Sequence, residues 1–281
     1  MLNELELQIA FQLDPKECYK KFIETNFRIV DKENREIDFR LNPIQEKYLI
    51  DDITDRDIIL KARQQGFSSL ILAKFTVDFI LKQNSQNVVV ADIDDNAEIL
   101  LERVKKYLRS YTEMTGNKIN LKYNSKTQLY NASNGATYTI GTAKNAEFGR
   151  SRTLTNLHLS EFAFYGHPDK ILAGALQAVT ESGYAVIETT ANGFNYFKEL
   201  WNECIEGRST FKPLFYKASD FYSQEFLEKK KLELGNLYVQ EYPENSLEAF
   251  IASGEQYFSS EALADYLSYT ENYESKKIPT S

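Results

Sequence analysis

The residues best suited to chemistry lie in the run Lys61-Ala-Arg-Gln-Gln-Gly-Phe-Ser-Ser69, between the apolar segment 58–60 and a helical pattern. A strand, a turn around one glycine and a helix that opens with two hydroxyls predict a phosphate-binding loop. Backbone N–H groups and the helix dipole attract the anion, and a serine hydroxyl can ligate Mg²⁺. The usual Walker A pattern has Gly-Lys-Ser/Thr, whereas here Phe67 takes the lysine position and the cations stand earlier, at Lys61 and Arg63. Alone, the run also fits an ordinary strand–helix turn.

A second predicted strand, over 154–159, ends in Ser160 and Glu161. In nucleotide hydrolases, a strand beside the phosphate-loop strand ends in two acids, the Walker B pair. The first acid holds Mg²⁺ through water, and the second activates the attacking water. This chain keeps the second acid, so we expect Glu161 to be the catalytic base. Ser160 contacts the metal only through water, which leaves Mg²⁺ more dependent on waters and ATP oxygens. Glu161 alone also fits a surface acid.

A third predicted strand, 184–188, leads into Thr189-Thr-Ala-Asn-Gly193. A small polar tip there can sense the γ-phosphate and pass its loss to a neighbouring segment, with Thr190 and Asn192 as the coupling residues. The alternative is a simple turn in which Gly193 supplies a positive φ. Ligands of open α/β sheets bind at the carboxyl ends of the strands, so we expect the three motifs to meet at one edge.

Taken in order, these motifs resemble the large terminase subunit of tailed bacteriophages, the ATP-driven motor that pumps viral DNA into a procapsid. The likeness covers roughly residues 40 to 255. Members of that family often have a deviant phosphate loop with the functional lysine five residues before the glycine, as Lys61 stands to Gly66. Ser-Glu in place of Asp-Glu is also a familiar variant there.

The resemblance implies a Mg²⁺-dependent ATPase with ATP and Mg²⁺ as cofactors, and Ser68 as the Mg²⁺ ligand of the loop. The family also has an adenine-reading glutamine upstream, and a Gln45 amide could pair with N6 and N7 of adenine. Taken alone, the run Asn42-Pro-Ile-Gln45 is also typical of a turn that leads into a helix. The predicted ATP-binding residues are Gln45, Lys61, Arg63, Gln64, Gln65, Gly66, Phe67, Ser68 and Ser69.

A loop at 141–152 carries two arginines, and the resemblance implies an arginine supplied in trans to a neighbouring active site. Arg150 is the better match and Arg152 the second. Such a residue contributes roughly 10³ to 10⁵ in rate. The implied partners are a homo-oligomeric ring (a pentamer on the capsid, a monomer in solution), double-stranded DNA, the portal protein and the small terminase subunit. The arginines would alternatively anchor the loop to nearby acids.

Net charge is 33 − 41 = −8, and most of it lies after residue 218. A basic cluster between 98 and 126 could follow DNA phosphates through weak, sequence-independent contacts. An ordinary solvated helix face followed by a hairpin is the alternative interpretation. The residues that we assign to DNA binding are Arg103, Lys105, Lys106, Arg109, Lys118, Lys122 and Lys126.

Two distant cysteines, Cys18 and Cys204, argue against a disulfide framework or a zinc site and fit a reducing compartment. Neither a signal peptide nor a membrane anchor is recognisable, so we expect no membrane partner. The expected location is the cytoplasm of an infected bacterial host, and transiently the portal vertex of the procapsid.

Apolar patterning predicts helices near 14–26, 44–50, 68–82, 95–115, 168–180 and 195–206, and strands near 57–61, 87–92, 118–140 (two or three), 154–159, 184–188 and 211–216. We therefore expect an α/β fold with a parallel-rich central sheet flanked by helices. The resemblance implies that this fold is a P-loop NTPase of the ASCE/RecA-like class. The expected division is an ATPase core over 1–218 and a small acidic helical subdomain over 219–281. Nothing after 258 has the clustered aspartates of the family's nuclease domain, so no nuclease activity is expected.

Two other function classes remain open. A helicase-like or remodelling nucleic-acid ATPase would need a second RecA-like domain, for which the chain is too short. A DNA-binding assembly module with a decayed phosphate loop is suggested by Phe67 and Ser160.

Overall fold

The computed structural model describes residues 11–144 and 153–251. Its strands are β1 (Arg28–Val30), β2 (Glu36–Asp38), β3 (Arg56–Lys61), β4 (Gln86–Ala91), β5 (Leu121–Asn124), β6 (Gln128–Asn131), β7 (Ala136–Thr142), β8 (Leu154–Ser160), β9 (Val179–Thr189) and β10 (Lys212–Tyr216). Its longer helices are α2 (Pro15–Asn26), α4 (Phe67–Leu81), α5 (Asp94–Thr115), α6 (Pro168–Leu176), α7 (Tyr196–Ile205) and α8 (Gln224–Leu234). Shorter helical segments are α3 (Pro43–Lys47), a π-helix (Tyr48–Asp52), α9 (Tyr238–Glu241), α10 (Ser246–Ile251), and 3₁₀ turns η2 (Phe162–Phe164), η3 (Ala218–Asp220) and η4 (Gly235–Leu237).

Eight strands form one central sheet in the order β10-β3-β9-β8-β4-β7-β6-β5. The pairs from β10 through to β7 are parallel, and β5 and β6 add an antiparallel edge. The parallel-rich α/β prediction is therefore confirmed. One expectation was wrong: the strand that carries Glu161, β8, does not lie beside the phosphate-loop strand β3, because β9 lies between them. The side chains at the end of β9 consequently occupy the centre of the site.

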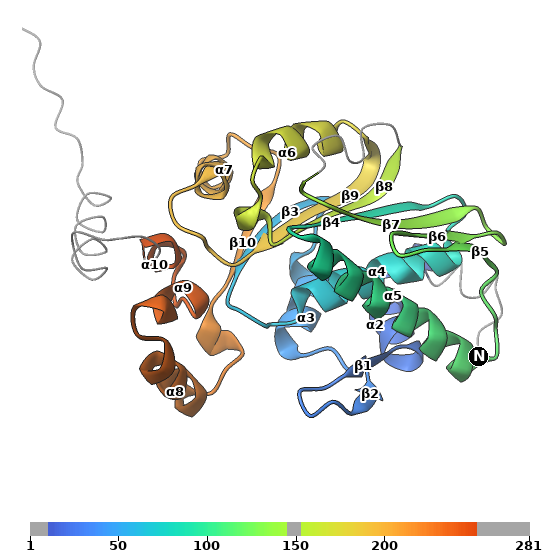
Figure 1. The fold of residues 1–281 in the computed structure, drawn as a ribbon, viewed down its shortest axis with the longest axis horizontal. Helices are drawn as coiled ribbons and strands as arrows, with labels where there is room; N and C mark the ends of the chain where they lie inside the picture. Colours follow the sequence, from blue (N-terminus) through green and yellow to red (C-terminus); the bar gives the residue numbers. More distant parts are fainter. Residues whose placement is uncertain (1–10, 145–152, 252–281) are drawn as a thin grey trace, which may run out of the picture.

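Helices cover both faces of this sheet, with α2, α3, α4 and α5 on one face and α6 and α7 on the other (Figure 1). Successive strand residues point to opposite faces. Thus Ile59 packs with the core beneath α4 and α5, whereas Ile58 and Leu60 pack with the core beneath α6 and α7. Because both faces are buried, the central strands read as continuous apolar runs.

Helix α4 begins directly after the phosphate loop, and the apolar sequence of the helix explains why it is buried at the centre of the molecule. Its first residue follows Gly66, whose φ of +84° is the left-handed conformation that glycine adopts without strain. The helix is apolar on almost every side and nearly all of it is buried, as expected of a helix enclosed between a sheet and other helices. Its N-terminus therefore faces the carboxyl edge of the sheet as a fixed element.

The helices after residue 217 lie beyond strand β10, at the end of the molecule that holds α8, α9 and α10 (Figure 1). A small apolar cluster joins them to the core, and it includes Ala62 of the phosphate-loop segment together with Tyr222 and Tyr242. The helical character predicted for this region is present in its described part, to residue 251. The division at residue 218 stays a prediction.

Two local features differ from the expectations. The β1–β2 hairpin was not predicted, because its three-residue strands are largely exposed and show no apolar alternation. The helix expected to end near residue 50 continues as a π-helix to Asp52. Within residues 11–144 and 153–251, no helix is both long enough and apolar enough to span a bilayer.

Candidate nucleotide-binding site

A cavity of about 680 Å³ opens at the carboxyl edge of the sheet, above the N-terminus of α4. Eight of the nine predicted ATP-binding residues line it, as do Glu161, Thr190 and Arg103. The remaining lining residues are Val30, Lys32, Asp92, Asn96, Phe164 and Glu241. The structure thus brings the first, second and third motifs to one place, as their positions at strand ends led us to expect.

Gln45, the ninth residue, lies behind the loop and holds its backbone. Its amide Nε2 donates to the carbonyl of Gly66 at 2.8 Å, and its Oε1 accepts from the Asn42 N–H at 3.0 Å. Asn42 also donates to the carbonyl of Gln65 at 3.1 Å. Both ends of the Gln45 amide are therefore engaged in shaping the phosphate loop, and its reading of adenine stays a prediction.

Phe67, which takes the usual lysine position, turns away from the cavity mouth. Only 1% of the residue is exposed, and its ring packs at 5.6 Å on Tyr48 and at 4.7 Å on Tyr216, measured between ring centroids. The side chain therefore anchors the start of α4 in the core. Phe67 would contribute to phosphate binding through its backbone N–H. The same holds for Gln64, whose φ of +58° is left-handed like that of Gly66.

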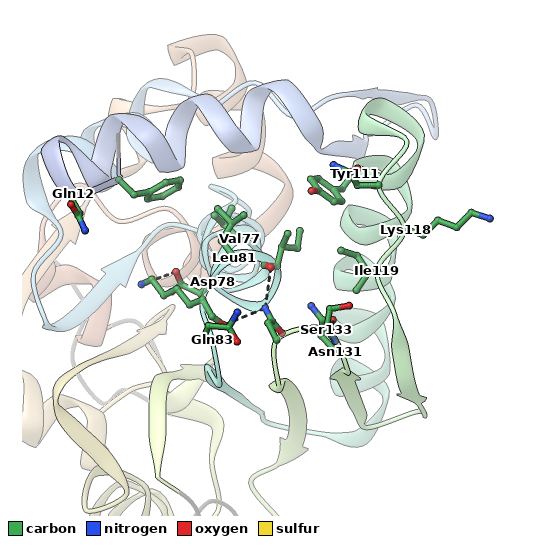
Figure 2. A pocket seen from close by; sticks show the side chains of 15 residues that line it. Gln12, Val77, Asp78, Leu81, Gln83, Tyr111, Lys118, Ile119, Asn131 and Ser133 are labelled. Carbon is green, nitrogen blue, oxygen red and sulfur yellow. Dashed lines mark hydrogen bonds and ion pairs between the residues drawn. The ribbon is translucent and has the colours of Figure 1, made fainter. Parts of the chain in front are cut away.

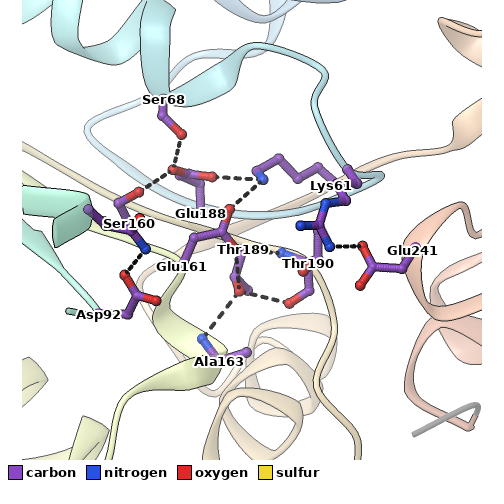
Figure 3. Close-up of polar contacts among 12 residues, drawn as sticks. Lys61, Ser68, Asp92, Ser160, Glu161, Ala163, Glu188, Thr189, Thr190 and Glu241 are labelled. Carbon is purple, nitrogen blue, oxygen red and sulfur yellow. Dashed lines mark hydrogen bonds and ion pairs between the residues drawn. The ribbon is translucent and has the colours of Figure 1, made fainter. Parts of the chain in front are cut away.

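Lys61 supplies the cation of the site, from the end of β3. Its Nζ lies 3.1 Å from Glu161 Oε1 and 3.1 Å from Glu188 Oε2, and its side chain is 5% exposed (Figure 3). Burial alone would favour neutral lysine, but the two carboxylates outweigh it and hold the pKa of Lys61 above its usual value. Lys61 is thus a permanent cation, placed between two acids from different strands.

Glu188 is the functional candidate that the sequence analysis missed. It is fully buried, and its Oε1 accepts hydrogen bonds from Ser68 at 2.7 Å and Ser160 at 2.8 Å (Figure 3). His158 Nε2 lies 3.2 Å from the same oxygen. Burial opposes ionisation, but Lys61, followed by His158 and Ser68, lowers the pKa of Glu188 well below its usual value. The available signal was an acid ending a buried apolar strand, where a charge needs partners.

Ser160 and Ser68 both turn their hydroxyls to Glu188, so neither is a bare surface hydroxyl. Ser160 stands directly opposite Glu188 in the register of β8 and β9 and is 4% exposed. His158 is completely buried, and its Nδ1 has no hydrogen-bond partner in the described part of the chain.

Glu161 adopts a left-handed backbone conformation, with φ of +55° and ψ of +44°. Such conformations cost energy for residues other than glycine and are concentrated at functional sites. Its side chain is 32% exposed and thus reaches the cavity. Burial of the carboxyl group raises the pKa of Glu161, while Lys61 acts in the opposite direction. A carboxylate of raised pKa that faces a cavity is a suitable general base.

The Thr-Thr-Ala-Asn-Gly loop is tied to the segment that carries Glu161. The Thr190 N–H lies 3.4 Å from Glu161 Oε2, and the Ala163 N–H donates to Thr189 Oγ1 at 3.2 Å. Asn192 donates to the carbonyl of Ala163 at 3.2 Å. Of the two predicted coupling residues, Thr190 contacts the candidate base itself and Asn192 contacts the turn that follows it.

The C-terminal helices reach both sides of the cavity. Arg63 donates its backbone N–H to the Glu241 carbonyl at 2.9 Å, and its guanidinium lies 3.0 Å from the Glu241 carboxylate. The neighbouring Gln240 donates to the carbonyl of Ala191 at 2.9 Å. Tyr222 donates to the Arg63 carbonyl at 2.7 Å. Two successive residues of α9 therefore hold the phosphate loop and the polar tip after β9.

Four of the basic residues predicted to contact DNA lie on α5, and the other three lie in the segment that follows this helix. Arg103 lines the nucleotide cavity, and its guanidinium is 3.5 Å from Ser69 Oγ. Three of the lysines form ion pairs within the described residues: Lys105 with Glu102, Lys106 with Glu36, and Lys126 with Glu98. The DNA-binding role stays a prediction. Arg150 and Arg152 lie outside the described residues.

A second cavity, of about 560 Å³, lies at the opposite end of α4 from the phosphate loop (Figure 2). It is lined by Phe11, Val77 and Leu81 among others, and Lys118 of the basic cluster also borders it. Among the described residues that line it, the one carboxylate is Asp78, which is already paired with Lys82 at 2.8 Å and with Asn156.

The donors around the nucleotide cavity suit Mg²⁺. Within the described residues, no group of three or more His, Cys, Asp or Glu side chains could hold a metal by itself. Mg²⁺, however, is usually bound by one or two carboxylates or hydroxyls together with waters and substrate phosphates. The Ser68 hydroxyl and the carboxylates of Glu161 and Asp92 line the cavity and are oxygen donors of this kind.

The fold is similar to solved ATPase domains of phage large terminases. The ATPase domain from Thermus phage P74-26 superposes with a TM-score of 0.57 at 18% identity, over 72% of this chain and 92% of that domain. The bacteriophage HK97 large terminase gives 0.61 at 18% identity, over 78% of this chain and 51% of that one. The large terminase of a thermophilic bacteriophage in complex with ATP-γ-S gives 0.54 at 11% identity, over 71% and 51%.

These similarities confirm the predicted fold: the mostly parallel sheet flanked by helices is the fold of phage large-terminase ATPase domains. It spans about half the length of the HK97 large terminase. No protein-family model matches the sequence, and neither does any curated protein.

Proposed function

We propose that this chain is the ATP-hydrolysing motor domain of a viral DNA-packaging terminase. The observation that carries the proposal is the meeting of Lys61, Ser68 and Glu161 at one cavity, above the N-terminus of a buried helix. A helix N-terminus, a buried ammonium ion and a carboxylate at the end of another strand of the same sheet are groups that promote phosphoryl transfer to water. The fold shared with terminase ATPase domains supports the same assignment.

In this proposal the loop amides of 64–69 and Lys61 bind the β- and γ-phosphates of ATP. Mg²⁺, held in part by Ser68, would neutralise charge on the phosphate oxygens. Glu161 orients the attacking water and accepts its proton, as its raised pKa favours. Thr190, whose N–H reaches Glu161, would transmit loss of the γ-phosphate to the adjoining segment.

The wider role is part of the same proposal, and the fold shared with phage large-terminase ATPase domains supports it. The motor would act on double-stranded DNA as a ring on the portal of a procapsid, with the small subunit as a further partner, inside the infected host cell. Each site would be completed by Arg150 of a neighbouring copy, or by Arg152, so an isolated monomer should hydrolyse ATP slowly.

The test is Mg²⁺-dependent ATP turnover measured against protein concentration, alongside nucleotide binding, for the wild type, Glu161→Gln and Arg150→Ala. Glu161→Gln should bind ATP and lose at least about 10²-fold in turnover. Turnover should rise faster than linearly with concentration and fall in Arg150→Ala. Glu181→Gln is the control, since Glu181 is exposed at the far end of β9.

Normal turnover in Glu161→Gln would refute the assignment of the base. Absence of any nucleotide binding by the wild type would refute the ATPase assignment and favour an assembly module with a decayed phosphate loop.

A further inference from the structure

The carboxylate that normally positions the Mg²⁺-binding serine of a phosphate loop is absent from its expected place. P-loop ATPases hold Mg²⁺ between the loop Ser or Thr and an acid that precedes the catalytic base in sequence. Here that position is Ser160, whose hydroxyl cannot carry charge. We propose that Glu188, on the next strand of the sheet, replaces the missing acid and positions Ser68 for Mg²⁺. This inference rests on the proposed ATPase function.

The contacts of Glu188 are those that the missing acid would make. Its Oε1 accepts the Ser68 hydroxyl at 2.7 Å. Because the Ser68 proton is directed at Glu188, the lone pairs of Ser68 Oγ remain available to a cation. Ser68 lines the cavity, whereas Glu188 is fully buried behind it. Glu188 is therefore a positioning residue that acts through Ser68.

The sheet register explains how the replacement works. Ser160 and Glu188 are paired residues on adjacent parallel strands, and the Ser160 hydroxyl donates to Glu188 Oε1 at 2.8 Å. The carboxylate beside the loop serine therefore comes from β9 instead of from β8. Ser160 is then a neutral donor that supports the relocated acid, and a second acid at 160 would repel it.

The other carboxylates near the cavity are less suited to this role. Glu161 accepts from the Thr190 N–H at 3.4 Å and is the candidate base. Asp92, at the end of β4, accepts from Asn96 at 2.7 Å. Neither has a hydrogen bond to Ser68 in the described structure. Of the residues that the structure describes, only Glu188 contacts both the loop serine and Lys61, the two groups that would bind the metal and the phosphates.

The experiment compares ATP affinity in Mg²⁺ with ATP affinity in EDTA, using a fluorescent ATP analogue and the full chain. In the wild type, Mg²⁺ should tighten binding. Glu188→Gln should reduce the Mg²⁺-to-EDTA affinity ratio by about 10–100-fold, the range typical of residues that orient a metal ligand. The control is Glu181→Gln, an exposed acid of the same strand, which should keep the ratio.

The decisive variant restores the acid at its usual place. Ser160→Asp combined with Glu188→Gln should recover most of the Mg²⁺ response, because one carboxylate again stands beside Ser68. A structural role for Glu188 would not predict this recovery. If Glu188→Gln alone does not fold, the double variant still carries the test, and Mg²⁺-insensitive binding by a folded double variant would overturn the proposal.

An unchanged Mg²⁺ response in folded Glu188→Gln would also overturn the proposal, while leaving the ATPase function intact. A wild type that binds no nucleotide with or without Mg²⁺ would instead refute the proposed function, and this inference with it.

Discussion

Replacing Gly66 by alanine should destabilise the protein far more than the same change at Gly116, although both glycines are left-handed. Gly66 has φ +84° and Gly116 has φ +75°. The left-handed conformation costs alanine roughly 1–2 kcal/mol, and this cost applies to both sites. A Cβ at 66, however, would lie 2.6 Å from Gln45 Nε2, whereas a Cβ at 116 meets nothing within 4 Å.

The extra cost at 66 follows from the Gln45 contact. The amide must move, and it then loses its 2.8 Å hydrogen bond to the Gly66 carbonyl. Gln45 itself is buried, and leaving its amide N–H without a partner costs about 1–3 kcal/mol. Gly66→Ala should therefore lower the free energy of unfolding by about 1–3 kcal/mol more than Gly116→Ala. For a chain of this size, the difference corresponds to a Tm lower by roughly 2–12 °C.

The difference in the free energy of unfolding can be measured by thermal and urea unfolding of the two variants. Each variant is also made in a Gln45→Ala background. Removal of the Gln45 amide should bring the two alanine substitutions to similar costs. Equal losses of stability in the presence of Gln45 would show that the glutamine does not brace the loop, and the reasoning would fail.

Three other changes are informative. Lys61→Met should cost about 3–5 kcal/mol in urea unfolding, because two carboxylates lose their buried cation; a stability equal to the wild type would contradict this. Glu241→Gln should free Arg63 for phosphate and tighten ATP binding by up to about fivefold in a titration, since this partly exposed pair contributes about 1 kcal/mol at most; weaker binding would refute it. Burial opposes ionisation of Asp78, but Lys74 and a second lysine lower its pKa below the usual 3.8. Its stabilisation is therefore present above pH 3.8 and is lost as pH falls through the lowered pKa, so Asp78→Asn should flatten the acid side of a stability–pH profile and lower stability at pH 7.

Much of the site could be predicted because its parts are continuous in sequence. The phosphate loop joins a buried strand to an apolar helix, and a turn at Gly66 needs a residue that tolerates positive φ. Glu161 ends an apolar run, and the ends of parallel strands meet at one edge. Local patterns therefore sufficed to place Lys61, Ser68 and Glu161 together.

What could not be predicted depends on which strands are neighbours. Sequence periodicity contains no information on strand order, so the place of β9 between β3 and β8 was missed. The role of Glu188 was missed for the same reason, because its partners come from three other segments of the chain. The function of Gln45 as a loop brace depends on its burial against Gly66, a contact between residues 21 positions apart.

The attachment of α9 to both loops has a consequence for amide hydrogen exchange. The Arg63 N–H is bonded to the Glu241 carbonyl, and the next residue back, Gln240, grips the carbonyl of Ala191. The Arg63 amide can exchange with solvent only when α9 lifts away, and lifting α9 also strains its bond to the loop after β9. Its exchange rate would therefore report how often the two walls of the cavity are released together.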